Sequence, residues 1–507
     1  MGLPPPSPHP SLDSFLRSHN LSLIPHSAKR RILIASVSIP AGTSLFTSKA
    51  LGTVVLDPTA CHYCLIRGDQ LSTPLTRCSS CKRATYCGRK CQKEDWDAGH
   101  ATLCKVWKHR VDGGESGDWD KDEEMLVKVL SSLKKGGDTV GVEAFLSLQG
   151  HEEVLDEIEK SEWDKIIQGV LKFPKMPAST TSRELFSHLL RFRSNNFSIH
   201  DGELFVLGEG TFPLGALLNH SCHPNCSVLY EGREQVVRTI RDVHAGEELL
   251  GTYVDGMGER GERQQTLWSK YGFECDCERC AQGGVDALLG VEGAMSVSEE
   301  KAVGEWLQGE LRKPVTGLLE SLYPVFFPPN GGPLATPIIP TTLNTLDTFI
   351  LTVLSHLPPS LASSPEEIWN ARHASLLQMI QSLPDPVPLP RLHARRLFTH
   401  VSRHLHTHLH TPEPSARLAL YVLCIYIISY ERFHPMIGVQ FVLAAKLCWN
   451  EGGESGNTGV VIKDLYRCAA RVVKCTHGSV GGVLRDIEEV LKIVEGAVPT
   501  NEPLVGI

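Results

Sequence analysis

Four pairs of potential metal ligands between residues 61 and 104 constrain the fold of this chain more than any other feature. The members of each pair are separated by two or three residues, which lets both side chains reach one ion from a turn or a helix. The segment also has too few aliphatic residues to form a core without metal. The spacing predicts two tetrahedral zinc sites, but it leaves open which pairs share an ion. The eight ligands are Cys61, Cys64, Cys78, Cys81, Cys87, Cys91, His100 and Cys104.

Length and charge limit the number of domains and the kinds of partner that we expect for this chain. A chain of 507 residues is too long for one hydrophobic core, so we expect two or three domains. The formal net charge of -8 gives no global attraction to nucleic acid or to an anionic membrane. The start "MGLPPPSPHP" lacks a secretory signal, and the longest apolar run, residues 418–430, is shorter than the roughly 20 residues of a membrane helix. We therefore expect a cytoplasmic and nuclear protein without a membrane segment, in which cysteines bind metal instead of forming disulfides.

A second cysteine cluster, "FECDCERC", predicts a third metal site. It supplies Cys275, Cys277 and Cys280, which is one ligand short of a closed tetrahedral zinc site. The stretch "GALLNHSCHPNCSVLY" offers two further thiols, Cys222 and Cys226. Spacing alone does not choose between them.

The ligand order of residues 61–104 resembles that of a MYND zinc finger. In that family the pairs interleave, so the resemblance implies one ion held by Cys61, Cys64, Cys87 and Cys91, and a second held by Cys78, Cys81, His100 and Cys104. The later part of this segment is rich in Lys and Arg. We expect a solvated basic face there, with DNA or an acidic protein as the alternative partner.

Three further stretches resemble the C-terminal half of a SET domain and its post-SET loop. They are "NHSCHPN", "RDVHAGEELLGTYVD" and "YGFECDCERC". This resemblance assigns the fourth ligand of the third zinc site to Cys222. Near the C-terminus, "YERFHPMIGVQFVLAAKLCW" and "KCTHGSVGGVLRDIEEVL" resemble the helical domain of the SET-and-MYND (SMYD) lysine methyltransferases. The resemblance then covers nearly the whole chain.

The SMYD resemblance implies an α+β protein with a SET-type β catalytic domain, interrupted by a zinc finger and a helical insertion, and an all-α TPR-like C-terminal domain. The expected divisions are 1–60 and 195–255 for the two SET halves, 61–104 for the finger, 105–194 for the helical insertion, 256–282 for the post-SET loop and 283–507 for the helical domain. Residues at helical spacing near 462–473 support the last assignment. The proline-dense stretch "YPVFFPPNGGPLATPIIP" predicts a long surface loop within it.

The same resemblance implies an active site for methyl transfer from S-adenosylmethionine to a lysine. Tyr253 matches the catalytic tyrosine, and Tyr271 and Phe273 match aromatic residues of the substrate channel. The implied cofactor contacts are Arg31, Asn195, Asn219, His220, Tyr253 and Phe273. A buried aromatic channel suits this chemistry, because lysine has a pKa of about 10.4 and must lose its proton before it attacks.

One motif departs from the family pattern. The Gly-x-Gly that lets the backbone approach the cofactor falls at Arg30, Arg31 and Ile32. We predict that a guanidinium there pairs with the methionine carboxylate. The alternative is a catalytically degenerate scaffold that recruits protein partners through the finger and the helical domain. For the enzyme, we expect a monomer with three zinc ions, and a histone or another protein as the lysine substrate.

Overall fold

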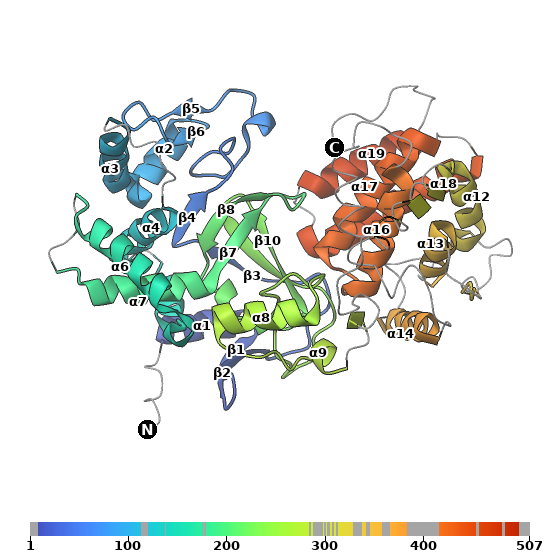
Figure 1. Ribbon diagram of the computed structural model, residues 1–507, viewed down its shortest axis with the longest axis horizontal. Coiled ribbons are helices and arrows are strands. Elements are labelled where there is room, and N and C mark those ends of the chain that lie inside the picture. Colours follow the sequence, from blue (N-terminus) through green and yellow to red (C-terminus); the bar gives the residue numbers. More distant parts are fainter. Residues whose placement is uncertain are drawn as a thin grey trace.

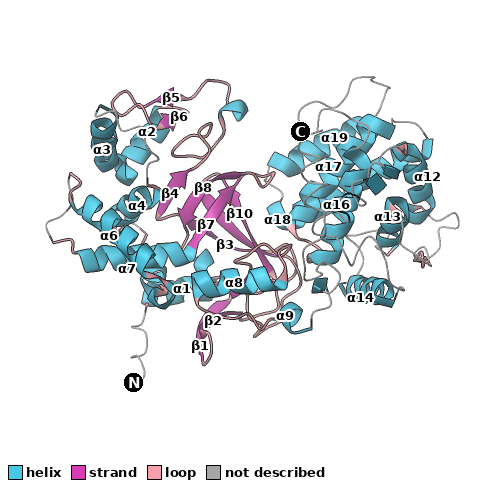
Figure 2. Ribbon diagram, in the orientation of Figure 1, coloured by secondary structure: helices cyan, strands magenta, loops and turns pink. Residues whose placement is uncertain are grey.

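The computed structural model combines helices and sheets, which confirms the expected mixed class. A strand-rich centre lies between a group of helices with the cysteine-rich segment on one side and the C-terminal helices on the other (Figures 1 and 2). The structure describes residues 9–112, 120–136, 138–174, 176, 179–282, 285–286, 298, 301, 305–306, 309–310, 313–327, 337–340, 345–356, 366–382, 415–452, 456–478 and 482–495. Among these residues, no helix is both long enough and apolar enough to cross a bilayer.

Two antiparallel sheets of three strands form the centre of the molecule. One has the order β10 (Cys226–Glu231), β11 (Glu234–Thr239) and β3 (Ser44–Lys49), and the other has the order β4 (Gly52–Val55), β8 (Val206–Thr211) and β7 (Asn196–His200). Each sheet therefore joins a strand from the first 60 residues to strands that follow residue 195. The intervening segment is an insertion between paired strands.

Three smaller strand pairs complete the sheets. Strands β1 (Leu21–His26) and β2 (Arg30–Ala35) form an antiparallel hairpin, and β5 (Thr76–Arg77) pairs with β6 (Thr85–Tyr86). The short strand β9 (Asn219–His220) runs parallel to β12 (Leu250–Gly251). This parallel pair brings the "NHSC" segment beside the chain that leads to Tyr253.

Helices of the N-terminal half pack around the sheets. Their bounds are α1 Pro10–Ser18, α2 Arg89–Asp95, α3 Ala101–Asp112, α4 Lys121–Lys135, α5 Thr139–Ser147, α6 Glu157–Leu171, α7 Ser182–Asn195, α8 Arg260–Tyr271 and α9 Glu278–Gln282. Local sequence sets several of these ends: the Asp156 side chain caps α6 in a capping box with Glu159. Leucine, phenylalanine and tryptophan side chains from α4 to α7 share one buried cluster with the strands.

The C-terminal helices enclose a second hydrophobic core. Their bounds are α12 Val315–Phe326, α13 Leu346–Ser355, α14 Glu366–Ser382, α16 Ser415–Ser429, α17 Pro435–Gly452, α18 Gly456–His477 and α19 Gly482–Glu495. Helix α16 contains the long apolar run and is buried along almost all of its described length, as a central helix requires.

The loop predicted from the proline-dense stretch begins later than expected. Tyr323 to Phe326 continue α12, with Pro324 inside the helix, and the loop prediction is wrong for these residues. Pro324 lacks the N–H of a single i to i−4 bond near the end of the helix, and burial of Leu322, Val325 and Phe326 favours the helix despite that loss. Residues 328–336 of the stretch lie outside the described part of the chain.

A buried lysine joins the cysteine-rich segment to the sheets. The Nζ of Lys128, on α4, donates to the Thr53 carbonyl of β4 at 2.9 Å and lies 2.9 Å from a Glu124 oxygen and 3.3 Å from Asp95. Asp95 also accepts a hydrogen bond from the Tyr86 hydroxyl at 2.7 Å. Burial would lower the pKa of Lys128, but the two carboxylates outweigh burial and raise it.

Replacing this lysine should destabilise the protein strongly. The Lys128→Met change leaves two buried carboxylates without their cation, so we expect unfolding free energy to fall by about 3–5 kcal/mol. Denaturant unfolding of zinc-loaded protein measures the loss. Lys135→Met, at the exposed end of the same helix, is the control and should change stability by less than about 0.5 kcal/mol. Equal stability of the two variants would contradict the role given to Lys128.

Candidate functional site

Three groups of cysteine and histidine side chains are arranged as metal centres. In each group the four ligand atoms lie within 4.8 Å of one another. The groups are Cys61, Cys64, Cys87 and Cys91; Cys78, Cys81, His100 and Cys104; and Cys222, Cys275, Cys277 and Cys280. The structure thus brings together the side chains that the resemblance assigns to each ion. Cys226, the other thiol near the third group, is buried in the core of the sheets.

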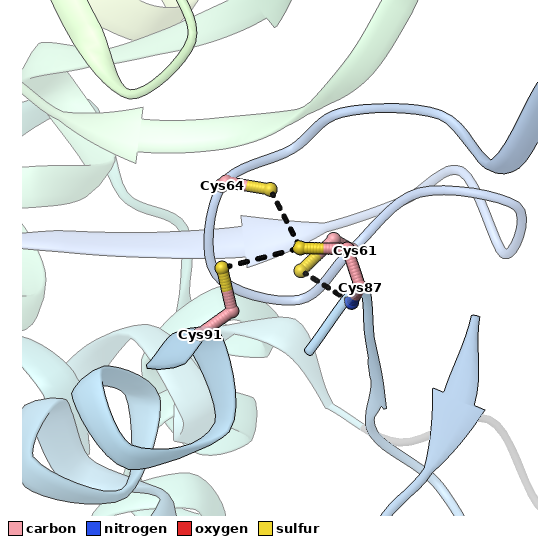
Figure 3. A group of neighbouring side chains, drawn as sticks. All are labelled: Cys61, Cys64, Cys87 and Cys91. Atoms are coloured by element: carbon pink, nitrogen blue, oxygen red, sulfur yellow. Dashed lines mark hydrogen bonds between the residues drawn. The ribbon is translucent and has the colours of Figure 1, made fainter. Parts of the chain in front are cut away.

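The ligand pairs of the first two centres alternate along the sequence of the finger. Figure 3 shows the thiols of the first centre turned toward one another, with Cys91 on α2 and the others on loops. Cys64 and Cys87 are separated by 3.6 Å between sulfurs, and in the second centre Cys78 and Cys104 are separated by 3.8 Å. Tetrahedral zinc with bonds of about 2.3 Å holds two sulfurs about 3.8 Å apart. These sulfur–sulfur distances therefore fit a tetrahedral zinc ion.

The histidine of the second centre has the protonation state that a ligand needs. Burial lowers the pKa of His100 to about 4, so its ring is neutral at neutral pH. Its Nε2 lies 3.8 Å from the Cys81 sulfur, and its Nδ1 faces Asp95 at 3.9 Å, beyond hydrogen-bond range. In zinc-bound histidine, one ring nitrogen typically binds the metal and the other faces a carboxylate or another acceptor.

The third centre ties two distant segments together. Cys222 follows β9, whereas Cys275, Cys277 and Cys280 follow α8, and the Cys222 and Cys280 sulfurs are 3.6 Å apart. Cys222, Cys275, Cys280, Leu267 and Tyr271 form one buried cluster, against which the partly buried Tyr253 and Phe273 pack. The metal centre and the aromatic residues are therefore parts of one packed unit.

We expect the zinc-replete protein to contain three zinc ions, one for each group of four ligands. Elemental analysis by plasma mass spectrometry measures this number. Cys277→Ser should reduce it to two, because it removes a ligand from the third centre alone. Two or fewer ions in undamaged wild-type protein, or an unchanged number in the variant, would contradict the assignment.

Tyr253 lies at the centre of the aromatic group. Its ring centroid is 4.7 Å from that of Tyr271, 5.4 Å from His220 and 6.5 Å from Phe273. Its backbone N–H donates to His220 Nδ1 at 3.0 Å, and its hydroxyl donates to the Leu218 carbonyl at 2.7 Å. Burial lowers the pKa of His220 to about 4, so the ring is neutral, and the tautomer with its proton on Nε2 lets Nδ1 accept from the Tyr253 N–H.

Gly272 forms the turn between the other two aromatic residues, Tyr271 and Phe273. Tyr271 is the last residue of α8, and Gly272 adopts a left-handed conformation with φ of 70°. Glycine reaches this conformation without the steric cost that a Cβ brings. The turn directs the chain from Tyr271 to Phe273, and burial raises the pKa of Tyr271 to about 12.

The position of the missing Gly-x-Gly is occupied by the β1–β2 hairpin. Arg30, the first residue of β2, has φ of 60°, a left-handed conformation that favours glycine. The guanidinium of Arg31 donates to the carbonyls of Leu217 at 2.8 Å and Ala216 at 3.3 Å. The Tyr253 hydroxyl donates to the carbonyl of the following residue, Leu218. Arg31 therefore lies against the loop that also holds the tyrosine hydroxyl.

Asn219 is held by two acceptors. Its Nδ2 donates to the Arg31 carbonyl and to Glu248 Oε1, both at 2.8 Å. Glu248 also forms an ion pair with Lys29 at 2.6 Å. The sequence did not predict a role for Glu248; its place in "HAGEELLG", two residues before the strand that pairs with β9, is the signal that could have revealed it.

A cavity of about 540 Å³ lies beside this group, between the sheets and the C-terminal helices. Its walls include Asn195, Tyr253, Tyr271, Lys270 and His434. The Asn195 side chain donates to the carbonyls of Gln149 and Arg191, at 2.7 and 2.8 Å. This volume suits a small organic ligand or the side chain of a protein substrate. Lys270, which the sequence reasoning did not single out, precedes Tyr271 directly.

Comparisons with known proteins agree with this arrangement. Residues 61–104 match the MYND finger family. The chain is 30% identical over 260 residues to N-lysine methyltransferase SMYD2-A of Xenopus laevis, covering 50% of this chain and 59% of that protein. It is 30% identical over 297 residues to histone-lysine N-methyltransferase SMYD3 of Homo sapiens, covering 54% and 67%. For N-lysine methyltransferase SMYD2 of Sus scrofa, identity is 32% over 227 residues, covering 43% and 50%. The matches thus span between half and two thirds of these relatives.

Proposed function

This chain belongs to the SMYD family, and from that premise we propose that it is a protein-lysine methyltransferase that uses S-adenosylmethionine. The observation that carries the proposal is the packing of Tyr253 with Tyr271 and Phe273 beside the third metal centre. The relatives SMYD2-A and SMYD3 are named as lysine methyltransferases. The strand pairs β4–β8 and β3–β11 support the assignment of residues 1–60 and 195–255 to two halves of one SET domain.

The cofactor would supply an electrophilic methyl group on its sulfonium. This chain would have to bind the cofactor, orient it toward the lysine amine and exclude water from the site. Asn195, Asn219, His220, Phe273 and Arg31 are the candidates for holding the cofactor. Tyr253 and Tyr271 would enclose the incoming lysine amine. An apolar enclosure disfavours the ammonium and exposes the nitrogen lone pair. Positioning would then account for most of the rate enhancement.

Arg31 determines how well the methionine end of the cofactor fits. Its guanidinium fork can pair with a carboxylate, which supports cofactor binding. Its bonds to the Leu217 and Ala216 carbonyls use two of the five N–H groups of the guanidinium. The same bonds favour the second candidate function, a scaffold that does not methylate, if they keep the guanidinium from turning to a cofactor carboxylate.

The proposal also covers the substrate, the partners, the oligomeric state and the location of the protein. We propose a histone or another protein as the substrate, protein partners for the finger and the TPR-like helical domain, a monomeric state, and a cytoplasmic and nuclear location. The interleaved centres of the finger leave its outer residues Arg89 and Lys90 exposed, as a partner surface requires. DNA is the weaker candidate for that surface.

Removing the hydroxyl of Tyr253 should separate catalysis from folding. Tyr253→Phe keeps the aromatic packing and removes the bond to the Leu218 carbonyl. The same hydroxyl would orient the lysine amine in the transition state. A hydrogen bond of that kind contributes about 1–3 kcal/mol, so we expect turnover to fall by about ten- to a hundredfold with nearly unchanged cofactor affinity. The assay follows labelled methyl groups from S-adenosylmethionine to a lysine-rich protein mixture.

Tyr63→Phe provides the matched control, because it removes a tyrosine hydroxyl in the finger, near Glu94. This variant should retain wild-type turnover. If Tyr253→Phe is as active as wild type, Tyr253 has been misassigned. If zinc-replete wild type neither binds the cofactor nor transfers methyl groups, the scaffold function is correct.

A further inference from the structure

Arg263 is a buried arginine whose side chain reaches the third metal centre. It lies in the first turn of α8, and it is 2% exposed. Its Nε donates to the Cys222 sulfur at 3.2 Å, and Nη2 donates to the Cys280 sulfur at 3.7 Å. Two of the four thiols of this centre therefore share one guanidinium.

The other donors of Arg263 are also occupied. Nη1 donates to the Gly258 carbonyl at 2.6 Å and to Asp286 Oδ1 at 3.0 Å, while Nη2 donates to Asp286 Oδ2 at 2.7 Å. The carboxylate thus holds the guanidinium with two parallel bonds, a strong and directional geometry. A lysine could not reproduce this arrangement, because its ammonium has no planar fork.

Asp286 continues the connection to the C-terminal helices. It accepts from Arg279 Nε at 3.1 Å, and Arg279 in turn donates from Nη1 to the Ser429 carbonyl, at the end of α16, at 3.3 Å. Arg279 is itself buried, at 6% exposed. The next residue of that segment, Tyr430, donates its hydroxyl to Asp255 at 3.0 Å.

The charge of the centre explains why two buried arginines lie here. Four thiolates around one divalent zinc leave a net charge of about -2, which is costly to bury. Hydrogen bonds from N–H groups to the sulfurs spread this charge and fix the orientation of the ligands. Arg263 supplies such bonds and Asp286 keeps it in place.

We propose that Arg263 is a positioning residue that holds the third zinc centre closed and, through Asp286 and Arg279, couples it to the C-terminal helices. This inference deepens the proposed site. It rests on zinc binding and is independent of methyl transfer, so its failure and failure of the methyltransferase proposal are distinguishable.

The first experiment measures zinc release from the full-length zinc-loaded protein. Arg263→Lys keeps the positive charge but loses the fork. Loss of such partners typically weakens metal binding by about 10–100-fold, so one of the three zinc ions should leave faster by roughly that factor in excess chelator. Arg260→Lys, an exposed arginine at the start of the same helix, is the control and should release zinc at the wild-type rate.

Cysteine labelling identifies the ion that leaves first. Iodoacetamide added during release should label Cys275, Cys277 and Cys280 before any finger cysteine. Equal release rates in Arg263→Lys and Arg260→Lys, or early labelling of finger cysteines, would overturn the role of Arg263. If Arg263→Lys does not fold, Asp286→Asn decides in the same assay, because it keeps Arg263 and weakens the carboxylate clamp on its guanidinium.

Hydrogen exchange tests the coupling to the helices. In Asp286→Asn, backbone amides at the end of α16 and through Tyr430 should exchange faster than in wild type, because the anchor on the Ser429 carbonyl is loosened. Amides in the middle of α19 are the internal reference. Unchanged exchange at the end of α16 in the folded variant would contradict the coupling.

Discussion

Metal coordination at Cys222, Cys275, Cys277 and Cys280 is the constraint on which the proposed active site depends. These ligands come from two segments more than 50 residues apart, and their sulfurs converge around one position. Tyr271 belongs to the same buried cluster, and Tyr253 and Phe273 pack against it. Without an ion, four crowded thiols cannot all ionise, and the loop that carries Phe273 loses its anchor. The geometry of the aromatic pocket is therefore a consequence of the metal centre.

The opposite wall of the site depends on backbone carbonyls. Residues 216–218 present consecutive acceptors, which the Arg31 guanidinium and the Tyr253 hydroxyl occupy. Arg30 adopts the left-handed conformation even though it carries a Cβ, so the hairpin keeps a backbone shape suited to the missing glycine. What changes in this chain is that Arg30 and Ile32 replace the two glycines, on either side of the Arg31 side chain. A methyltransferase and a scaffold differ here in whether that side chain can turn to a ligand.

The sequence predicted best what is encoded in short spacings. The Cys pairs fixed the number of metal centres, and the family resemblance supplied the grouping of their ligands, including the choice of Cys222 over Cys226. Contacts between distant residues carry no such signal, so the links from Arg263 to Cys222 and from Lys128 to Asp95 required the structure. The helix through Pro324 was missed because tertiary burial outweighs local proline preference. The divisions between domains remain predictions.

The central claim is that Arg31 does not prevent the cofactor from binding, and isothermal titration calorimetry on zinc-replete protein tests it most directly. S-adenosylmethionine should bind with one site per chain. Arg31→Ala should bind more weakly, because the partner of the methionine carboxylate is lost. If wild type shows no binding and Arg31→Ala gains it, the arginine obstructs the pocket. That result would contradict the account and identify the chain as a scaffold whose pocket is closed.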